Sequence, residues 1–247
     1  MTFQEKVIVV TGGASGMGRA TATLLGGQGA KVVIADVDTE AGTRVASMIG
    51  PNAFFEKVDL TSLDEIQALA ERTEERFGRI DGLANVAAVF PRYSFLDTPP
   101  EAWQQVNDVC NRATFFLSQA VARSMIRTET PGAIVNVTSG AAFRPVPRMS
   151  AYGSTKGAVV ALSRGMASEL APHGIRVNVM APGHTASEST LRMSSPAELE
   201  EMATTLLGGR WMEPEEPAET IVFLLSEASR GMTGAVINVN QGNFMPH

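Results

Sequence analysis

Continuous apolar runs rich in β-branched residues recur along the chain, and segments with the apolar spacing of helices separate them. The runs at 6–11, 31–36 and 82–86 are apolar almost throughout and do not alternate with polar residues. A strand of this kind is covered on both faces, as in a parallel sheet with helices packed on each side. The pattern therefore predicts an α/β fold, a Rossmann-like, doubly wound parallel sheet with helices on both faces.

The same pattern locates the individual elements. The predicted strands are residues 6–11, 31–36, 53–58, 82–86, 133–138, 175–180 and 235–239. The predicted helices are residues 17–28, 38–48, 62–77, 100–126, 152–171 and 214–227. No linker rich in Gly, Ser or Pro interrupts this alternation, so residues 1–247 are expected to form a single domain. The one long departure, about 182–213, contains a short helical pattern and is interpreted as a substrate lid.

Composition narrows the class of partner. The chain has 247 residues, of which 44% are hydrophobic and 19% charged, so it can bury a large core. A net charge of −6 argues against a nucleic acid or an anionic membrane as the main partner, because both attract basic proteins. The single cysteine, Cys110, leaves no internal disulfide and no multi-cysteine metal site, and no metal is expected. Small-molecule chemistry fits this composition.

The beginning of the chain carries neither a basic leader nor a cleavage site of the signal-peptide type. No apolar run approaches the roughly 18 residues that a membrane-spanning helix needs. These features predict a soluble protein of the cytoplasm.

A glycine-rich turn, TGGASGMG at 11–18, directly follows the first predicted strand and leads into a helix. Glycines let the backbone approach a pyrophosphate closely, and the free N–H groups at a helix start attract its negative charge. The spacing is G-x-x-x-G-x-G, and such a turn alone is weak support for nucleotide binding. Its position between a strand and a helix, with the acid Asp36 at the end of the next strand, strengthens the interpretation.

Asp36 bears on the choice of dinucleotide. A carboxylate there can accept hydrogen bonds from the adenosine ribose and repel a 2′-phosphate, which favours NAD over NADP. The alternative is that Asp36 is a helix cap or a solvated loop acid, a role that Asp38 could equally fill.

Three further residues point to proton transfer. Ser139 ends the fifth predicted strand, and Tyr152 and Lys156 open the next helix four positions apart. Residues at that spacing share a helix face, so the ammonium group can lower the phenol pKa from its usual value of about 10. Taken alone, such a pair is more often a surface pair than a catalytic one.

These motifs, with Asp59, Asn85 and Pro182-Gly183, resemble the short-chain dehydrogenase/reductase family over about residues 5–242. The resemblance implies an NAD(H)-dependent oxidoreductase, a short-chain alcohol dehydrogenase or ketoreductase. Its catalytic residues would be Ser139, which steadies the substrate oxygen, Tyr152, the acid/base, and Lys156, which also holds the nicotinamide ribose. The implied cofactor-binding residues are Gly12, Ser15, Gly16, Met17, Gly18, Asp36, Asp59, Leu60, Asn85, Tyr152, Lys156, Pro182, Gly183, Thr185 and Ser187. The resemblance also implies a homo-oligomer, a tetramer or dimer, assembled through the helices near 103–126 and 152–170.

One position departs from the family's pattern. The family has an asparagine seven residues after a tryptophan, and here the slot after Trp103 holds Cys110, with Asn111 one residue late. Adjacent helical residues point about 100° apart, so Asn111 replaces its neighbour only if the helix shifts or bulges. The Cys110 thiol is either an inert small hydrophobe, which we favour, or a reactive group beside the site.

The substrate side is less readable. Arg144 and Arg148 could pair with an acidic substrate, although solvated charge is the more common reason for such residues. His184 receives no role. The residues expected to line an apolar pocket, or else to belong to the core, are Phe90, Phe143, Met149, Leu191, Met193 and Trp211. Two alternative functions stay open: a dehydratase or epimerase, for which the chain is short, and a catalytically impaired nucleotide-binding regulator.

Overall fold

The computed structural model describes residues 2–204 and 206–244. Seven strands form one sheet in the order β3-β2-β1-β4-β5-β6-β7, and every neighbouring pair is parallel. The strands are β1 Val7–Thr11, β2 Lys31–Asp36, β3 Ala53–Lys57, β4 Gly82–Asn85, β5 Ala133–Val137, β6 Arg176–Pro182 and β7 Val236–Val239. The predicted single-domain, doubly wound sheet is confirmed, and each strand lies within a few residues of its predicted range.

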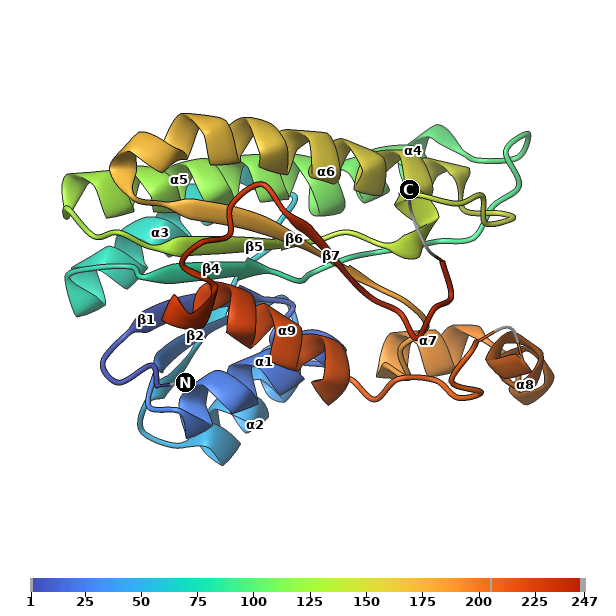
Figure 1. Cartoon of the computed structure of the whole chain (residues 1–247), viewed down its shortest axis with the longest axis horizontal. Helices are drawn as coiled ribbons and strands as arrows, with labels where there is room; N and C mark the ends of the chain where they lie inside the picture. The colour runs from blue at the N-terminus through green and yellow to red at the C-terminus, as the bar shows by residue number, and fades with distance from the viewer. Residues whose placement is uncertain (1, 205, 245–247) are drawn as a thin grey trace.

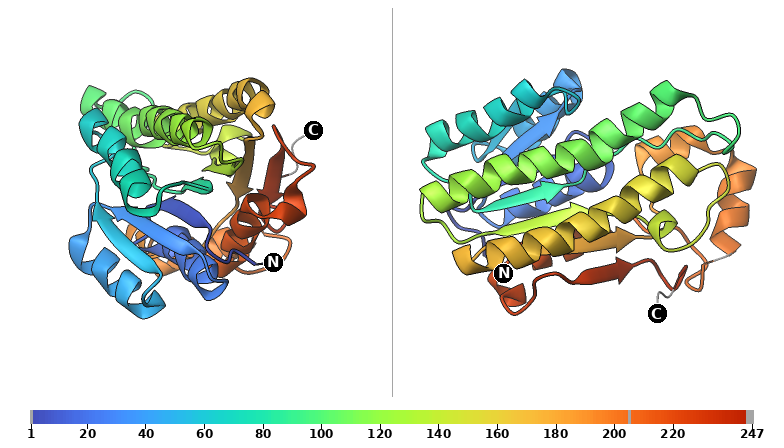
Figure 2. Two further views of the ribbon diagram at one scale, coloured as in Figure 1. Left: turned by 90° about the vertical axis from the view of Figure 1, so that its left-hand side faces the viewer. Right: turned by 90° about the horizontal axis from the view of Figure 1, so that it is seen from above.

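Helices cover both faces of this sheet (Figures 1 and 2). One layer contains α1 Gly16–Gly27, α2 Thr39–Ile49 and α9 Glu215–Leu225. The other contains α3 Leu63–Phe77, α4 Pro100–Asn107, α5 Ala113–Arg127 and α6 Ser150–Leu170. Within the described part of the chain, no helix is long and apolar enough to cross a membrane.

The core explains why the strands are apolar on both faces. Ile8 and Val10 pack into the cluster beneath α1 and α9, whereas Val9, between them, packs into the cluster beneath α3 and α5. Each of these side chains is fully buried, which stabilises the fold by about 1.5–3 kcal/mol per side chain. A polar residue at any of them would face a dry helix layer.

The stretch predicted as one helix, 100–126, is interrupted. Between α4 and α5 the chain makes a π-helical turn, Asp108–Arg112, in which the backbone accommodates one extra residue. The predicted helical segment is confirmed, but the π turn inside it was not predicted, because apolar spacing does not distinguish a π turn from an α turn over five residues. The turn lies at Cys110, the position where the sequence departs from the family's pattern.

The strand order reverses beside β1, because the chain runs outward through β2 and β3 and then returns to place β4 on the other side. Ligands of doubly wound sheets bind in the crevice at the carboxyl ends of the strands at such a point. The predicted lid lies at this edge and contains two helices, α7 Glu188–Met193 and α8 Pro196–Thr204, where one was expected (Figure 1). Thr205, inside the predicted helical pattern, lies outside the described residues.

Candidate active site

The glycine turn is built for close backbone approach. Gly12 adopts φ +66°, and a Cβ there would lie 2.9 Å from the Cα of Ala87 on the loop after β4. A Cβ on Gly18 would collide with the Gly12 carbonyl oxygen. The Thr11 hydroxyl joins the two loops by accepting from the amides of Val86 at 3.0 Å and Ala87 at 3.2 Å. The glycines therefore permit a tight turn into the start of α1, which suits a pyrophosphate.

The structure separates the two acids after β2. Asp38 is the N-cap of α2, where its side chain accepts from the Ala41 amide at 2.9 Å. Asp36 ends the strand and is half-buried, with its carboxylate accepting from the amides of Ala14 and Asp38 at 3.1 Å each. Asp36 is therefore tied to the glycine turn, where an adenosine ribose would lie in a dinucleotide of this orientation.

Asp59 and Leu60 follow β3 at the same edge of the sheet. The Asp59 carboxylate accepts from both the amide and the hydroxyl of Thr61 at 2.8 Å, and these hydrogen bonds lower its pKa. One carboxylate oxygen of this exposed side chain is thus committed to the turn, and Leu60 is half-buried beside it.

Asn85 belongs to a buried chain of polar side chains. Its amide donates to Asn136 on β5 at 2.8 Å and to Ser118 on α5 at 3.0 Å, and Asn136 donates to Ser163 on α6 at 2.9 Å. The side chain of Asn85 therefore faces into the protein. Its position at the end of β4 leaves contact with a ribose to the backbone and to the residues that follow.

Ser139, Tyr152 and Lys156 come together at the carboxyl end of β5. Ser139 follows the strand, and Tyr152 and Lys156 occupy the first two turns of α6. Tyr152 is 8% exposed and Lys156 is 2% exposed, so this pair is not a surface pair. The Lys156 ammonium lies 5.7 Å from the centre of the Tyr152 ring and donates to the Val137 carbonyl at 2.8 Å.

Burial dominates the electrostatics of these groups. It raises the pKa of the Tyr152 phenol, the nearby Cys110 thiol raises it further, and a hydrogen bond with Ser139 lowers it in part. Burial also lowers the pKa of Lys156. The sequence interpretation considered the positive charges that favour the phenolate and did not include burial. In the folded chain the loss of water opposes the phenolate, which therefore depends on every positive charge that can be placed nearby.

Cys110 lies in the π turn and packs with Tyr152 and Val106. It is fully buried, and its thiol points to the Val89 carbonyl at 3.6 Å. Its own carbonyl accepts from the Thr114 hydroxyl at 3.0 Å. The helix therefore does bulge at this position, and it is Cys110 whose side chain packs with Tyr152. Such burial is typical of an unreactive cysteine.

The segment after β6 reaches back to the glycine turn. Pro182 ends the strand, and a Cβ on Gly183 would lie 2.7 Å from the Cα of Asn240. Thr185 is buried and pairs with Met212 across the lid. Ser187 caps α7 and lies against Gly16, where an added Cβ would be 3.1 Å from the Ser187 Cβ. The glycine turn and the segment after β6 thus meet at the predicted pyrophosphate site.

Sequence reasoning missed two charged residues at this meeting point. Glu188 of the lid accepts a hydrogen bond from the Gly16 amide at 2.9 Å and pairs with Arg19 of α1 at 2.6 Å. The sequence offered only two signals: Glu188 follows Pro182-Gly183 closely, and Arg19 directly follows Gly18. Neither signal is specific.

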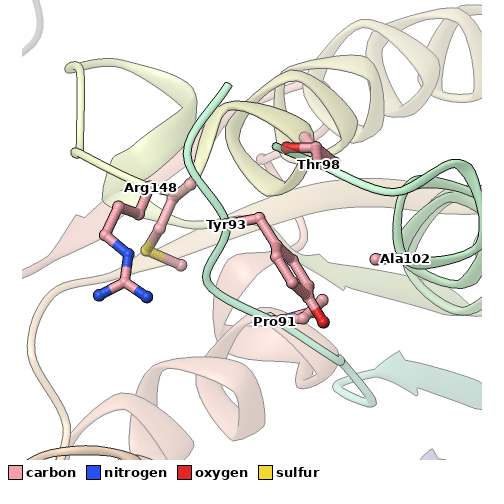
Figure 3. Close-up of a pocket in the computed structure, with 7 residues that line it drawn as sticks. Pro91, Tyr93, Thr98, Ala102 and Arg148 are labelled. Atoms are coloured by element: carbon pink, nitrogen blue, oxygen red, sulfur yellow. The ribbon is translucent and has the colours of Figure 1, made fainter. Parts of the chain in front are cut away.

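The predicted pocket residues divide into three groups. Phe90 contacts the Tyr152 ring with centroids 5.8 Å apart, and Met149 packs on the same cluster. Phe143 stacks on Phe244 near the end of the chain, and Trp211 contacts His184 at 5.0 Å. Leu191 and Met193 are exposed on α7. Beside this cluster a small pocket separates the loop after β4 from α6 (Figure 3), lined by Pro91, Tyr93, Thr98, Ala102, Arg148, Met149 and Ala151.

Comparison with known proteins agrees with this geometry. A family model described as enoyl-(acyl carrier protein) reductase matches residues 12–243. The 2,5-dichloro-2,5-cyclohexadiene-1,4-diol dehydrogenase of Sphingobium indicum is 36% identical over 241 residues, 96% of each chain. A short-chain type dehydrogenase/reductase from Mycobacterium marinum superposes with a TM-score of 0.94 at 30% identity, covering 99% of this chain and 98% of its own. This chain belongs to the short-chain dehydrogenase/reductase family.

A second relative of this short-chain dehydrogenase/reductase is named for a different substrate. The 5-keto-D-gluconate 5-reductase of Escherichia coli is 34% identical over 241 residues, covering 96% of this chain and 94% of its own. Both named relatives are oxidoreductases, and the family as a whole uses a nicotinamide cofactor. The chain is accordingly an oxidoreductase of this family, and its candidate site brings together Ser139, Tyr152 and Lys156.

Proposed function

We propose that this short-chain dehydrogenase/reductase transfers a hydride between NAD(H) and a secondary alcohol or its ketone, with Tyr152 as general acid and base. The observation that carries the proposal is the group formed by half-buried Ser139 with buried Tyr152 and Lys156, at the edge of the sheet where the glycine turn also lies. The bound nicotinamide ring supplies the hydride acceptor in oxidation and the hydride donor in reduction.

The three side chains divide the proton chemistry. Tyr152 accepts the hydroxyl proton in oxidation and returns a proton to the oxygen in reduction. Lys156 stabilises the phenolate by its charge, 5.7 Å from the ring. Ser139, which lies near enough to Tyr152 to lower the pKa of its phenol, orients the substrate oxygen toward the phenol. Phe90 covers the ring and keeps water from this group.

The residues around the glycine turn fit a dinucleotide. The amides at the start of α1 suit the pyrophosphate, Asp36 suits the adenosine ribose, and Asp59 suits the adenine. Asp36 favours NAD because a 2′-phosphate beside it would place two negative charges together. Thr185 and Ser187 offer hydroxyls on the nicotinamide side.

Replacement of Tyr152 by phenylalanine tests the proposal and keeps the ring contact with Phe90. We expect turnover of secondary alcohols and ketones to fall by about 100-fold or more, with NADH binding retained. The matched control is Tyr93→Phe, which alters the chain's other tyrosine, an exposed one. A butenoyl thioester belongs in the substrate panel because of the description that the matching family model carries.

Two results would contradict the proposal. Full activity of Tyr152→Phe would remove Tyr152 as acid and base. NADH binding by the unaltered protein without turnover of any substrate, with either cofactor, would favour a nucleotide-binding regulator on the same fold.

We further propose a cytoplasmic homo-oligomer that acts on a small molecule and on neither nucleic acid nor membrane. The outer faces of α4 and α5 support the assembly, because Trp103, Phe115 and Phe116 are exposed there. Exposed aromatic groups of this kind commonly mark a protein interface. The net charge of −6 supports the choice of partner.

A further inference from the structure

Three loops that follow neighbouring strands carry basic residues to the substrate side of the site. Arg92 lies on the loop after β4, Arg144 on the loop after β5, and His184 on the segment after β6. These strands are adjacent and parallel, so their carboxyl-end loops meet above the same edge of the sheet. The Arg144 amide donates to the Gly140 carbonyl at 3.1 Å, which places its backbone one turn from Ser139.

Neither arginine has a carboxylate partner. Among the described residues, no acidic oxygen lies within 4.0 Å of the guanidinium group of Arg92 or Arg144. Arg144 donates instead to the side-chain oxygen of Asn243 at 2.6 Å, and Arg92 makes a long contact to the Ser194 hydroxyl at 3.4 Å. The Nε atoms of both arginines are buried without a hydrogen-bond acceptor in the described structure. A buried N–H of a cation without an acceptor is costly, so the arrangement favours a further acceptor that the described residues do not supply, such as an anionic ligand.

The positive charges of Arg92 and Arg144 act on His184. Burial lowers the pKa of His184, and the positive charges of Arg144 and Arg92 lower it further, so the imidazole is neutral at pH 7. The acid that faces the cluster is Glu198 on α8, whose pKa is lowered by hydrogen bonds from Ser195 and then by Arg92 and Arg148. Glu198 is exposed and is bonded to Ser195 at 2.7 Å and 2.9 Å, so it screens the outer side only.

Arg148 links two loops and is not proposed to contact the substrate. Its side chain is exposed and its backbone is in the left-handed region, with φ +63°. Its guanidinium donates to the Arg92 carbonyl at 3.2 Å, and its own carbonyl accepts from the Tyr93 amide at 3.1 Å. Figure 3 shows the Arg148 side chain directed away from the Tyr93 ring. Arg148 thus ties the loops after β4 and β5 together and positions Arg92, and solvated charge describes the rest of it.

We propose that Arg92 and Arg144 bind a carboxylate of the substrate, so that the preferred alcohol or ketone is a hydroxy acid or keto acid. This inference rests on the proposed function for the position of the reacting oxygen, at Tyr152. Phe90, two residues before Arg92, contacts the Tyr152 ring. Arg144 lies on the loop that begins at Ser139. Both arginines are thus attached to loops that also carry groups of the Tyr152 site, and the proposal requires one molecule to span from them to the phenol.

Matched substrates test the proposal. Pyruvate, acetoacetate and levulinate are compared with their methyl esters as ketones for the unaltered protein and for Arg92→Met and Arg144→Met. We expect kcat/KM for the best keto acid to exceed that of its ester by about tenfold or more, and to fall by about tenfold in each variant with the ester unchanged. The control is Arg230→Met, an exposed arginine before β7 at the opposite edge of the sheet.

A binding measurement separates this inference from the proposed function. Valerate and valeramide are titrated against the NADH-bound protein, with the fluorescence of Trp211, next to His184, as the signal. Binding of valerate that is lost in Arg144→Met, without turnover of any ketone, supports the carboxylate site and contradicts the proposed function. Ketone turnover with equal rates for acid and ester contradicts the carboxylate site alone. If the protein neither turns over a ketone nor binds valerate, both the proposed function and the carboxylate site are contradicted.

Discussion

The amide of Gly16, at the first position of α1, donates a hydrogen bond to the carboxylate of Glu188, the first residue of lid helix α7, at 2.9 Å. The second carboxylate oxygen pairs with Arg19 at 2.6 Å. A carboxylate from the lid therefore holds the N–H group and the cation that a dinucleotide phosphate would use. The lid and the cofactor are expected to compete for the start of α1.

Glu188→Ala tests this competition. Removal of the carboxylate frees the Gly16 amide and Arg19, so we expect the Kd for NADH to fall by about three- to tenfold. Titration of NADH fluorescence measures it. Glu198→Ala, on the neighbouring helix α8, is the matched control, because its carboxylate is bonded to Ser195 and not to α1. An unchanged or higher Kd in Glu188→Ala would show that the two anions do not compete.

The pH dependence of alcohol oxidation should report the phenol. Burial raises the pKa of Tyr152, so the phenolate is scarce at neutral pH and oxidation is expected to speed up as pH rises toward that pKa. Lys156→Met removes a positive charge that favours the phenolate. The rise of kcat/KM with pH should then occur at higher pH, and the rate at pH 7 should fall by about tenfold or more. A profile measured over about pH 6–10 that keeps its shape in Lys156→Met would contradict a role for the ammonium in this titration.

Asp36 and Asp38 form a matched pair for cofactor preference. Asp36→Ala removes the carboxylate at the end of β2, and we expect kcat/KM with NADP to rise by about tenfold relative to NAD. Asp38→Ala removes the N-cap of α2 and should cost about 0.5–2 kcal/mol of stability without a change in preference. A wild-type preference for NADP, or an equal effect of both variants, would contradict the role of Asp36.

Cys110 offers a test of the π turn. Its thiol is buried and has only a long contact to the Val89 carbonyl, so Cys110→Ser should keep turnover within about threefold and lower the melting temperature slightly. Labelling by a thiol reagent should be slow until the protein is unfolded. Loss of activity in Cys110→Ser that Cys110→Asn does not restore would mean that the thiol itself takes part.

Assembly can be tested at the exposed aromatic residues of α5. Phe115 and Phe116 contact each other edge to face, and they are 43% and 37% exposed. The double variant Phe115→Ser, Phe116→Ser should shift the mass measured by light scattering toward the monomer. Leu96→Ser, on the loop after β4, is the control. A wild-type protein that is already monomeric would contradict the proposed homo-oligomer.

The sheet was predictable because its signal is local. Each strand is a short apolar run covered on both faces, and the residues between strands carry the helical period and caps such as Ser62. Ser139, Tyr152 and Lys156 were found from their spacing together with the other motifs that resemble the family, and α6 is the regular helix that this spacing requires. The structure adds that Tyr152 and Lys156 are buried, which the spacing did not predict.

The missed features depend on contacts between distant residues. Gly16 and Glu188 are 172 positions apart, and nothing near either of them in sequence indicates the contact. Among the described residues, Arg92 and Arg144 have no carboxylate partner, and this follows from which loops meet above β4 and β5, a property of strand order. The π turn at Cys110 leaves no periodic trace, since it lasts for a single turn.

The buried polar chain from Ser118 through Asn85 and Asn136 to Ser163 ties two strands to two helices beneath the site. Loss of one member leaves the polar atoms of its neighbours buried without hydrogen-bond partners. Replacement of all four by apolar groups of similar volume can leave the stability nearly unchanged. Single changes are therefore selected against and concerted changes are tolerated. Among the relatives of this chain, these four positions are expected to covary as a unit.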